Sequence, residues 1–176
     1  IKTPFSVLTT PARHLEALEK LERARERFEE SPWNVYEGPE KPELLLVCSG
    51  PSALYAREAV ELLDVEESVG ILSLGTTFPL PSQLIERYMS RARRTMVIEE
   101  IDPFVEDQIK QLAAERNLPP YGEPLYGRGT GHIIPTGELN PDEVLKGVAR
   151  VLRTERLPAQ DVGYSRLADQ LVAEKT

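Results

Sequence analysis

Three short apolar runs are spaced along the middle of the chain, and segments of helix length separate them. The runs cover residues 44–48, 69–74 and 95–98, and each is almost continuously apolar rather than alternating. Continuous runs of about five apolar residues are typical of strands that are buried on both faces of a sheet. Strands that alternate with helices predict β-α-β units and a parallel sheet. The pattern therefore predicts an α/β fold.

The polar segments between and around these runs carry helix signals. Residues 10–30 begin with the capping residue Thr10 and Pro11, and their thin apolar stripe predicts a helix that lies on the surface. The segment 141–153 follows Asn140, which is a well-formed helix start. Further helices are predicted for residues 52–63, for the segment after Ser82 and for residues 103–117.

The remaining segments divide the chain into three parts. Residues 31–42 hold three prolines and read as a linker, which gives a first part of residues 1–42 with the charged helix. Residues 43–153 form the α/β domain, with one possible short strand at 125–126. Residues 154–176 are a tail in which a short helix at 164–173 is possible. Because the chain begins with Ile1 rather than Met, we expect it to be part of something longer.

Composition narrows the function classes. The net charge of -8 and the isoelectric point near 5.0 argue against nucleic acid or an anionic membrane as the main partner. The single cysteine, Cys48, excludes an internal disulfide and a cysteine-ligated zinc or iron–sulfur site. It is expected to be a small core residue. The low cysteine content indicates an intracellular, reducing location, so we expect a cytoplasmic protein. No apolar run approaches the roughly 20 residues of a membrane span.

Ligands of parallel sheets usually bind at the carboxyl ends of the strands. Turn residues with hydroxyl groups and free N–H groups follow two of the predicted strands, and such turns can hold a phosphate or carboxylate at a helix N-terminus. The prolines that follow Phe78 delay the helix there, so Phe78 fits a contact surface for another domain better. The candidate turn residues are Ser49, Gly50, Gly75, Thr76 and Thr77.

Three carboxylates end the third predicted strand, at Glu99, Glu100 and Asp102. Neighbouring carboxylates can raise one another's pKa and serve as acid and base. The structural alternative is that Asp102 caps the following helix, while one glutamate faces solvent and the other pairs with a basic residue such as Arg94.

A glycine-rich loop covers residues 127–132 and ends in His132. Its backbone N–H groups could converge on an anion, with Arg128 adding charge, or the glycines could serve only tight turns. His132 could shuttle protons or could order the loop by hydrogen bonding. The candidate residues of this loop are Gly129, Thr130, Gly131 and His132.

Together these segments resemble the alpha subunit of indolepyruvate ferredoxin oxidoreductase, a family of thiamine-diphosphate-dependent 2-oxoacid:ferredoxin oxidoreductases. The resemblance spans most of the chain in one order, and its two longest motifs are specific. The matching residues are Ser31-Pro32 with Asn34, Ser49-Gly50, and residues 74–81, 99–106, 129–133 and 137–142.

The resemblance implies a three-layer α/β/α domain that is similar to the transketolase C-terminal domain. Its sheet would have five largely parallel strands and could include one antiparallel edge strand. In the family this domain lies between a pyrimidine-binding and a pyrophosphate-binding domain. The resemblance assigns no catalytic or metal-binding residue to this segment, whose strand-end loops would face the active site or a neighbouring domain.

The resemblance also implies what the whole enzyme does in amino-acid catabolism. It would oxidatively decarboxylate an arylpyruvate with coenzyme A and give an aryl-acetyl-CoA, carbon dioxide and reduced ferredoxin. Thiamine diphosphate, Mg²⁺ and 4Fe-4S clusters would serve the full enzyme, whose partners would be a smaller beta subunit and ferredoxin. The Gly-Asp-Gly motif for pyrophosphate and the cluster cysteines do not occur here, so this segment alone should be inactive.

Two other functions remain open from the residues alone. The chain could be a stand-alone module that binds a nucleotide or coenzyme A through residues 127–132. It could also be a purely structural assembly domain, which the charged helix at 10–30 and the exposed surface at Phe78 would suit.

Overall fold

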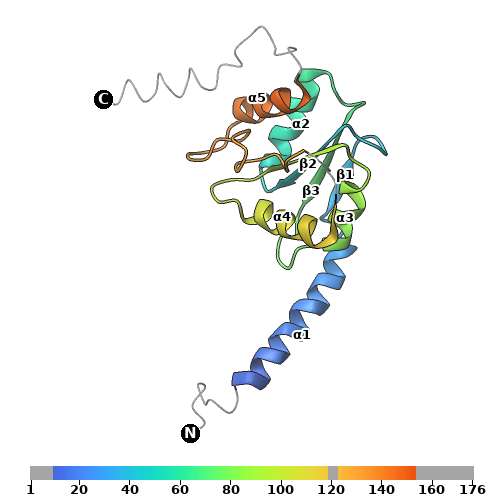
Figure 1. Ribbon diagram of the computed structural model, residues 1–176, viewed down its shortest axis with the longest axis vertical. Coiled ribbons are helices and arrows are strands. Elements are labelled where there is room, and N and C mark those ends of the chain that lie inside the picture. Colours follow the sequence, from blue (N-terminus) through green and yellow to red (C-terminus); the bar gives the residue numbers. More distant parts are fainter. Residues whose placement is uncertain (1–9, 119–122, 154–176) are drawn as a thin grey trace, which may run out of the picture.

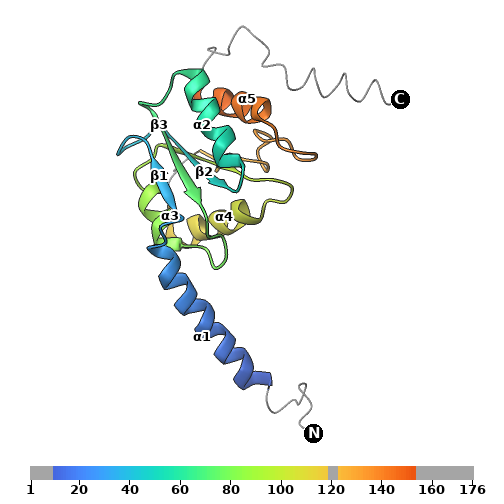
Figure 2. The same cartoon turned by 180° about the vertical axis from the view of Figure 1, so that it is seen from behind.

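The computed structural model describes residues 10–118 and 123–153, in which helices cover both faces of a central sheet (Figures 1 and 2). The strand order is β1-β3-β2-β4, with β1 antiparallel to β3 and the other neighbours parallel. This confirms the predicted α/β class. The strands are β1 (Val35–Glu37), β2 (Leu44–Ser49), β3 (Val69–Leu74) and β4 (Arg94–Ile98).

The central strand β2 is buried on both faces, as its continuous apolar run predicts. Leu44 pairs with Val69 of β3 on one side and with Arg94 of β4 on the other. Leu44, Leu46 and Cys48 belong to the core on one face of the sheet, whereas Leu45 and Val47 belong to the core on the other face. This alternation follows from the two-residue period of a strand.

Two helices cover each face of the sheet (Figure 1). Helices α2 (Ser52–Leu63) and α5 (Pro141–Leu152) share one core, and α3 (Ser82–Met89) and α4 (Phe104–Arg116) share the other. The connection from β2 through α2 leads to β3, whereas α3 leads back past β2 to β4. The chain therefore reverses its direction of winding at β2. In open α/β sheets the crevice at such a reversal is the usual ligand site.

Helix α1 (Thr10–Glu29) extends away from the body of the domain (Figures 1 and 2). None of its residues is buried, which confirms the predicted surface helix. Its C-terminal end is fixed to the domain by Glu29, whose two carboxylate oxygens accept hydrogen bonds from the N–H groups of Gln83 (3.0 Å) and Leu84 (2.8 Å). Glu29 therefore caps the first turn of α3 from another element.

Several boundaries differ from the sequence prediction. The described residues form four strands rather than five, and at 125–126 only Tyr126 joins the sheet. Its N–H donates to the carbonyl of Thr95 and its carbonyl accepts from the N–H of Val97, each at 2.9 Å. Residues 31–42 are not only linker, since they include β1. The predicted tail with its helix at 164–173 lies outside the described residues, and the division into three parts stays a prediction.

Candidate functional site

The turns that follow β2, β3 and β4 meet at one edge of the sheet around a hollow of about 590 Å³. This edge is the point at which the winding reverses, so it is the site that the topology favours. Seven of the twelve candidate residues singled out from the sequence line this hollow, and their role there stays a prediction. These seven are Ser49, Gly50, Gly75, Thr77, Glu99, Glu100 and Asp102.

The side chain of Asn34 holds the turn after β3 in place. Its Oδ1 accepts hydrogen bonds from the N–H groups of Gly75 (3.0 Å) and Thr76 (3.1 Å), and its Nδ2 donates to the carbonyl of Phe28 (2.8 Å). The N–H groups of Gly75 and Thr76, which could have received an anion, are therefore used by a side chain of the same chain. Asn34 was part of the matching segments, but its long-range role had no local sequence signal.

Glu99 is buried and caps helix α4. Its carboxylate oxygens accept hydrogen bonds from the N–H groups of Val105 and Glu106, both at 2.8 Å. Burial raises the pKa of Glu99, and these two hydrogen bonds oppose the rise. Because both oxygens are committed, Glu99 is a structural carboxylate rather than one half of an acid–base pair with Glu100.

The capping role expected of Asp102 is therefore wrong, because α4 has no side-chain cap from its own N-terminal residue and Glu99 takes that place. The expected pairing of a glutamate of this cluster with Arg94 is also wrong. Arg94 instead forms ion pairs with Glu43 at 3.0 Å and Glu123 at 2.8 Å. Of the two glutamates, Glu100 is the exposed one, as expected.

The glycine-rich loop is organised around Glu106, which is fully buried. Its carboxylate accepts hydrogen bonds from the N–H groups of Arg128 (2.8 Å) and Gly129 (3.0 Å) and pairs with Lys110 at 2.6 Å. The anion that this loop binds is thus a carboxylate of the protein itself. This arrangement argues against the nucleotide- or coenzyme-A-binding alternative at residues 127–132.

The side chains of the loop are also used internally. The Arg128 guanidinium donates to the carbonyls of Glu99 (3.2 Å) and Ile134 (2.7 Å), so it is not available to a phosphate. His132 Nδ1 lies 3.0 Å from Thr130 Oγ1, and its ring makes a T-shaped contact with the ring of Tyr126. Burial and the nearby Arg150 lower the pKa of His132. This geometry fits a role of His132 in ordering the loop. Among the described residues, no contact of His132 indicates that it shuttles protons.

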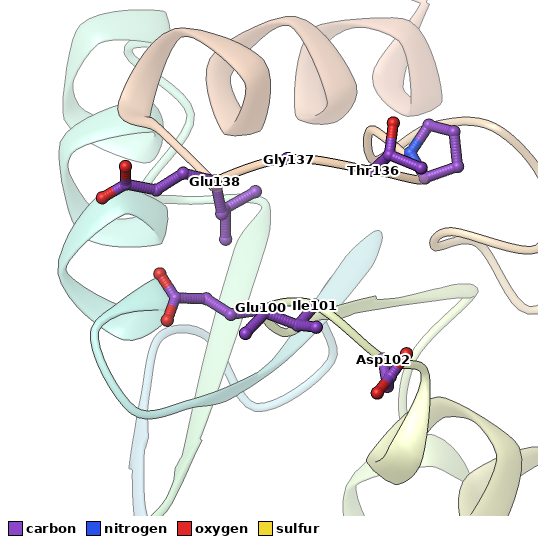
Figure 3. Close-up of a pocket in the computed structure, with 8 residues that line it drawn as sticks. Glu100, Ile101, Asp102, Thr136, Gly137 and Glu138 are labelled. Carbon is purple, nitrogen blue, oxygen red and sulfur yellow. The ribbon is translucent and has the colours of Figure 1, made fainter.

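A second hollow of about 630 Å³ adjoins the first (Figure 3). It lies between residues 100–102 at the end of β4 and residues 135–139, which precede α5. In Figure 3 the carboxylates of Glu100 and Glu138 extend toward the same side, and the Asp102 side chain points away from them. From the sequence, Ile101 belongs to the candidate stretch 99–102 but was given no role, and Glu138 was not selected, although both lie within the matching segments. The loop residues Gly129, Thr130, Gly131 and His132 line neither hollow, and neither does Thr76.

The charges around both hollows are negative. Neither lining includes a lysine or arginine, and each includes Glu100 and Asp102. In the described part of the chain, no three His, Cys, Asp or Glu side chains come together as a metal site. A carboxylate-lined, cation-free surface repels a diphosphate. The residues present therefore do not fit thiamine diphosphate with its Mg²⁺.

Ile101, between the two hollows, has an unfavourable backbone conformation. Its φ is 62°, in the left-handed region that β-branched residues rarely adopt, although its side chain is 72% exposed. We expect Ile101→Asn to raise the free energy of unfolding by about 0.5–1 kcal/mol, because asparagine tolerates this region. Urea unfolding would measure the gain. Ile101→Ala is the control, since it keeps the unfavourable φ and should give no comparable gain.

Cys48 lies at the end of β2 and is only 1% exposed. Burial raises the pKa of its thiol to about 12. At pH 8 roughly one thiol in ten thousand would then be ionised, so we expect no reaction with a thiol reagent in the folded protein. One equivalent should react after unfolding in guanidinium, and the exposed Ser90→Cys variant should react at once. Rapid labelling of the unmodified protein would contradict the buried placement.

No protein-family model matches the chain. It is similar to proteins named indolepyruvate oxidoreductase subunit IorA. The one from Pyrococcus horikoshii is 37% identical over 121 residues, which are 66% of this chain and 18% of that protein. The one from Methanothermobacter thermautotrophicus is 31% identical over 153 residues, 84% of this chain and 24% of that protein. The chain thus spans about a fifth of the length of these relatives.

The fold is similar to part of a solved structure, a 2-oxoglutarate:ferredoxin oxidoreductase from Magnetococcus marinus with 2-oxoglutarate, coenzyme A and succinyl-CoA bound. The TM-score is 0.55 at 16% identity, and the match covers 83% of this chain and 24% of that one. At this identity the likeness concerns the fold alone. Within the described residues, every helix is too short or too polar to cross a membrane.

Proposed function

The chain is a relative of indolepyruvate oxidoreductase subunit IorA over the segment that it spans, and from this premise we propose that it forms a domain of such an enzyme that does not hold the cofactor. The whole enzyme would be cytoplasmic. It would convert an arylpyruvate and coenzyme A to an aryl-acetyl-CoA, carbon dioxide and reduced ferredoxin. A smaller beta subunit would complete it.

The observation that carries this proposal is the internal use of the groups that could have bound a cofactor. Asn34 takes the donors of the turn after β3, and Glu106 takes those of the glycine loop. The Arg128 guanidinium donates its hydrogen bonds to the carbonyl groups of Glu99 and Ile134. The remaining surface of the strand-end edge is acidic and partly apolar. Such a surface suits contact with protein better than contact with phosphate.

Thiamine diphosphate, Mg²⁺ and the 4Fe-4S clusters would therefore be held by other parts of the enzyme. In our proposal this domain lies in the middle of the alpha subunit, between the domains that bind the two ends of the cofactor. Its contribution would be to support their arrangement. No step of the reaction is assigned to its residues.

The full-length product of the gene that encodes this chain, produced with its partner subunit, tests the proposal. We expect it to reduce ferredoxin when it is supplied with indolepyruvate and coenzyme A. The isolated chain should give no turnover and no heat of binding when thiamine diphosphate and Mg²⁺ are titrated into it. Clear binding to the isolated chain, or a full-length product that turns over no 2-oxoacid, would contradict the proposal.

A further inference from the structure

Three large apolar side chains form an exposed ridge on the strand-end edge, and we refer to Phe78, Phe104 and Ile101 as the apolar ridge. Their exposed fractions are 59%, 53% and 72%. The ring centroids of Phe78 and Phe104 lie 6.2 Å apart, and Phe104 and Ile101 line the same hollow. Exposed apolar side chains are normal when they are scattered, but a contiguous group indicates a binding surface.

Three exposed carboxylates line the second hollow together with Ile101, and we refer to Glu100, Asp102 and Glu138 as the acidic rim. Elsewhere in the domain some exposed carboxylates, such as Glu37, have an arginine partner, whereas others, such as Glu66 and Glu67, form no ion pair within the described residues. Within the described ranges, no ion pair or side-chain hydrogen bond satisfies any member of the acidic rim. The rim is therefore a negative charge for which the described residues supply no cation.

The ridge is held in place by the domain beneath it. Glu99 precedes the rim and is fixed to α4 by two hydrogen bonds, and Phe104 is the first residue of that helix. Between these fixed points Ile101 keeps its unfavourable φ of 62°. A rigid surface loses little conformational entropy when it binds, which favours association.

We propose that the apolar ridge and the acidic rim dock a basic polypeptide segment that carries an apolar side chain at its centre. This proposal rests on the proposed function, because the segment would come from another domain of a protein built like the relatives, of whose length this chain spans about a fifth. Lysine or arginine side chains of the segment would pair with the rim, while its apolar side chain would cover the ridge.

The charge pattern disfavours a second copy of this chain as the occupant. A two-fold symmetric contact places the same surface on both sides, so it would set one acidic rim against another. The net charge of -8 adds to this repulsion. A basic segment of a different domain removes the repulsion and supplies the missing cations.

Hydrogen–deuterium exchange tests the docking, with the full-length gene product compared with the isolated chain. We expect the amides of residues 99–104 and 135–139 to exchange at least about tenfold more slowly in the full-length protein, because docking excludes solvent and restricts local opening. Residues 64–68, which precede β3 and lie at the opposite end of that strand from the strand-end edge, should exchange equally in both. Equal exchange at the ridge in the two proteins would overturn the proposal.

A charge reversal tests the chemistry of the partner. The double variant Glu100→Lys/Glu138→Lys should abolish the protection in the full-length protein. The matched control, Glu66→Lys/Glu67→Lys, makes the same charge change at two exposed residues before β3 and should leave the protection intact. Protection that survives the reversal of the rim would overturn the assignment of a basic segment.

Two further measurements separate the alternatives. Sedimentation of the isolated chain should give a monomer, whereas a dimer with protected residues 99–104 would overturn the proposal in favour of a second copy. Ferredoxin reduction by the same full-length preparation reports on the proposed function alone. Protection without turnover would therefore overturn the proposed function and support the docking.

Discussion

Replacing Glu106 with alanine is expected to destabilise the domain by about 3 kcal/mol or more, since removing one member of a buried ionic network leaves the others without partners. Glu106 is fully buried and joins Lys110, Arg128 and Gly129. Its loss leaves the buried N–H group of Arg128 and the partly buried N–H group of Gly129 without their acceptor, and it leaves a lysine charge without its closest partner. The loop at residues 127–132 would lose the group around which it is built.

Urea unfolding followed by circular dichroism would measure this loss. Asp107→Ala is the matched control, because Asp107 is the next residue of the same helix, is 66% exposed and pairs with the same lysine at 3.3 Å. It should change stability by less than about 0.5 kcal/mol, as exposed ion pairs do. Equal effects of the two substitutions would show that Glu106 does not organise the loop.

The parts of the fold that could be predicted from sequence are those that depend on local pattern. The strands at 44–48, 69–74 and 95–98 contribute side chains to the cores on both faces of the sheet. Because both faces are buried, almost every residue of these strands is apolar, and this continuous run can be recognised in the sequence. Helix α5 was equally predictable, because Asn140 caps it within its own first turn by accepting from the N–H of Glu143 at 3.0 Å.

The parts that could not be predicted depend on contacts between distant segments. Strand β1 has only three residues and lies among prolines, and it exists because it pairs with β3. Tyr126 joins the sheet through a single bridge to Met96, too little for a sequence pattern. The described residues therefore form four strands rather than the five expected from the resemblance.

The sequence predicts where the candidate site lies, but it does not predict which groups at the site are free to bind a ligand. Parallel strands bring their carboxyl ends together, so the turns around Ser49, Gly75 and Glu99 had to meet. Side chains from distant segments decide which backbone N–H groups of these turns and loops remain free to bind a ligand. Asn34 is 42 residues from Thr76, and Glu106 is 22 residues from Arg128. Asp102 had the local signature of a cap, but the helix begins after Pro103, and Glu99 accepts from the N–H groups of Val105 and Glu106 instead.

The second large effect is expected at Gly127, which the structure packs directly against the Glu106 carboxylate. A Cβ at residue 127 would overlap Glu106 Oε2 and would lie 2.8 Å from Glu106 Cδ and 3.2 Å from the carbonyl oxygen of Val97. The buried carboxylate has no room to retreat without losing its hydrogen bonds. We therefore expect Gly127→Ala to destabilise the domain by about 2–3 kcal/mol, the usual cost of overpacking a buried site.

The same overlap predicts that the two substitutions are not additive. In a Glu106→Ala background the space beside residue 127 is vacant, so Gly127→Ala should then cost less than about 1 kcal/mol, a coupling typical of residues in contact. Gly131→Ala is the control, because a Cβ there meets no atom within 4 Å and the cost comes from its φ of 71° alone. That cost, about 1–2 kcal/mol, should be the same in both backgrounds. Full additivity of Gly127→Ala and Glu106→Ala in urea unfolding would mean that the carboxylate and the glycine do not share one packed site.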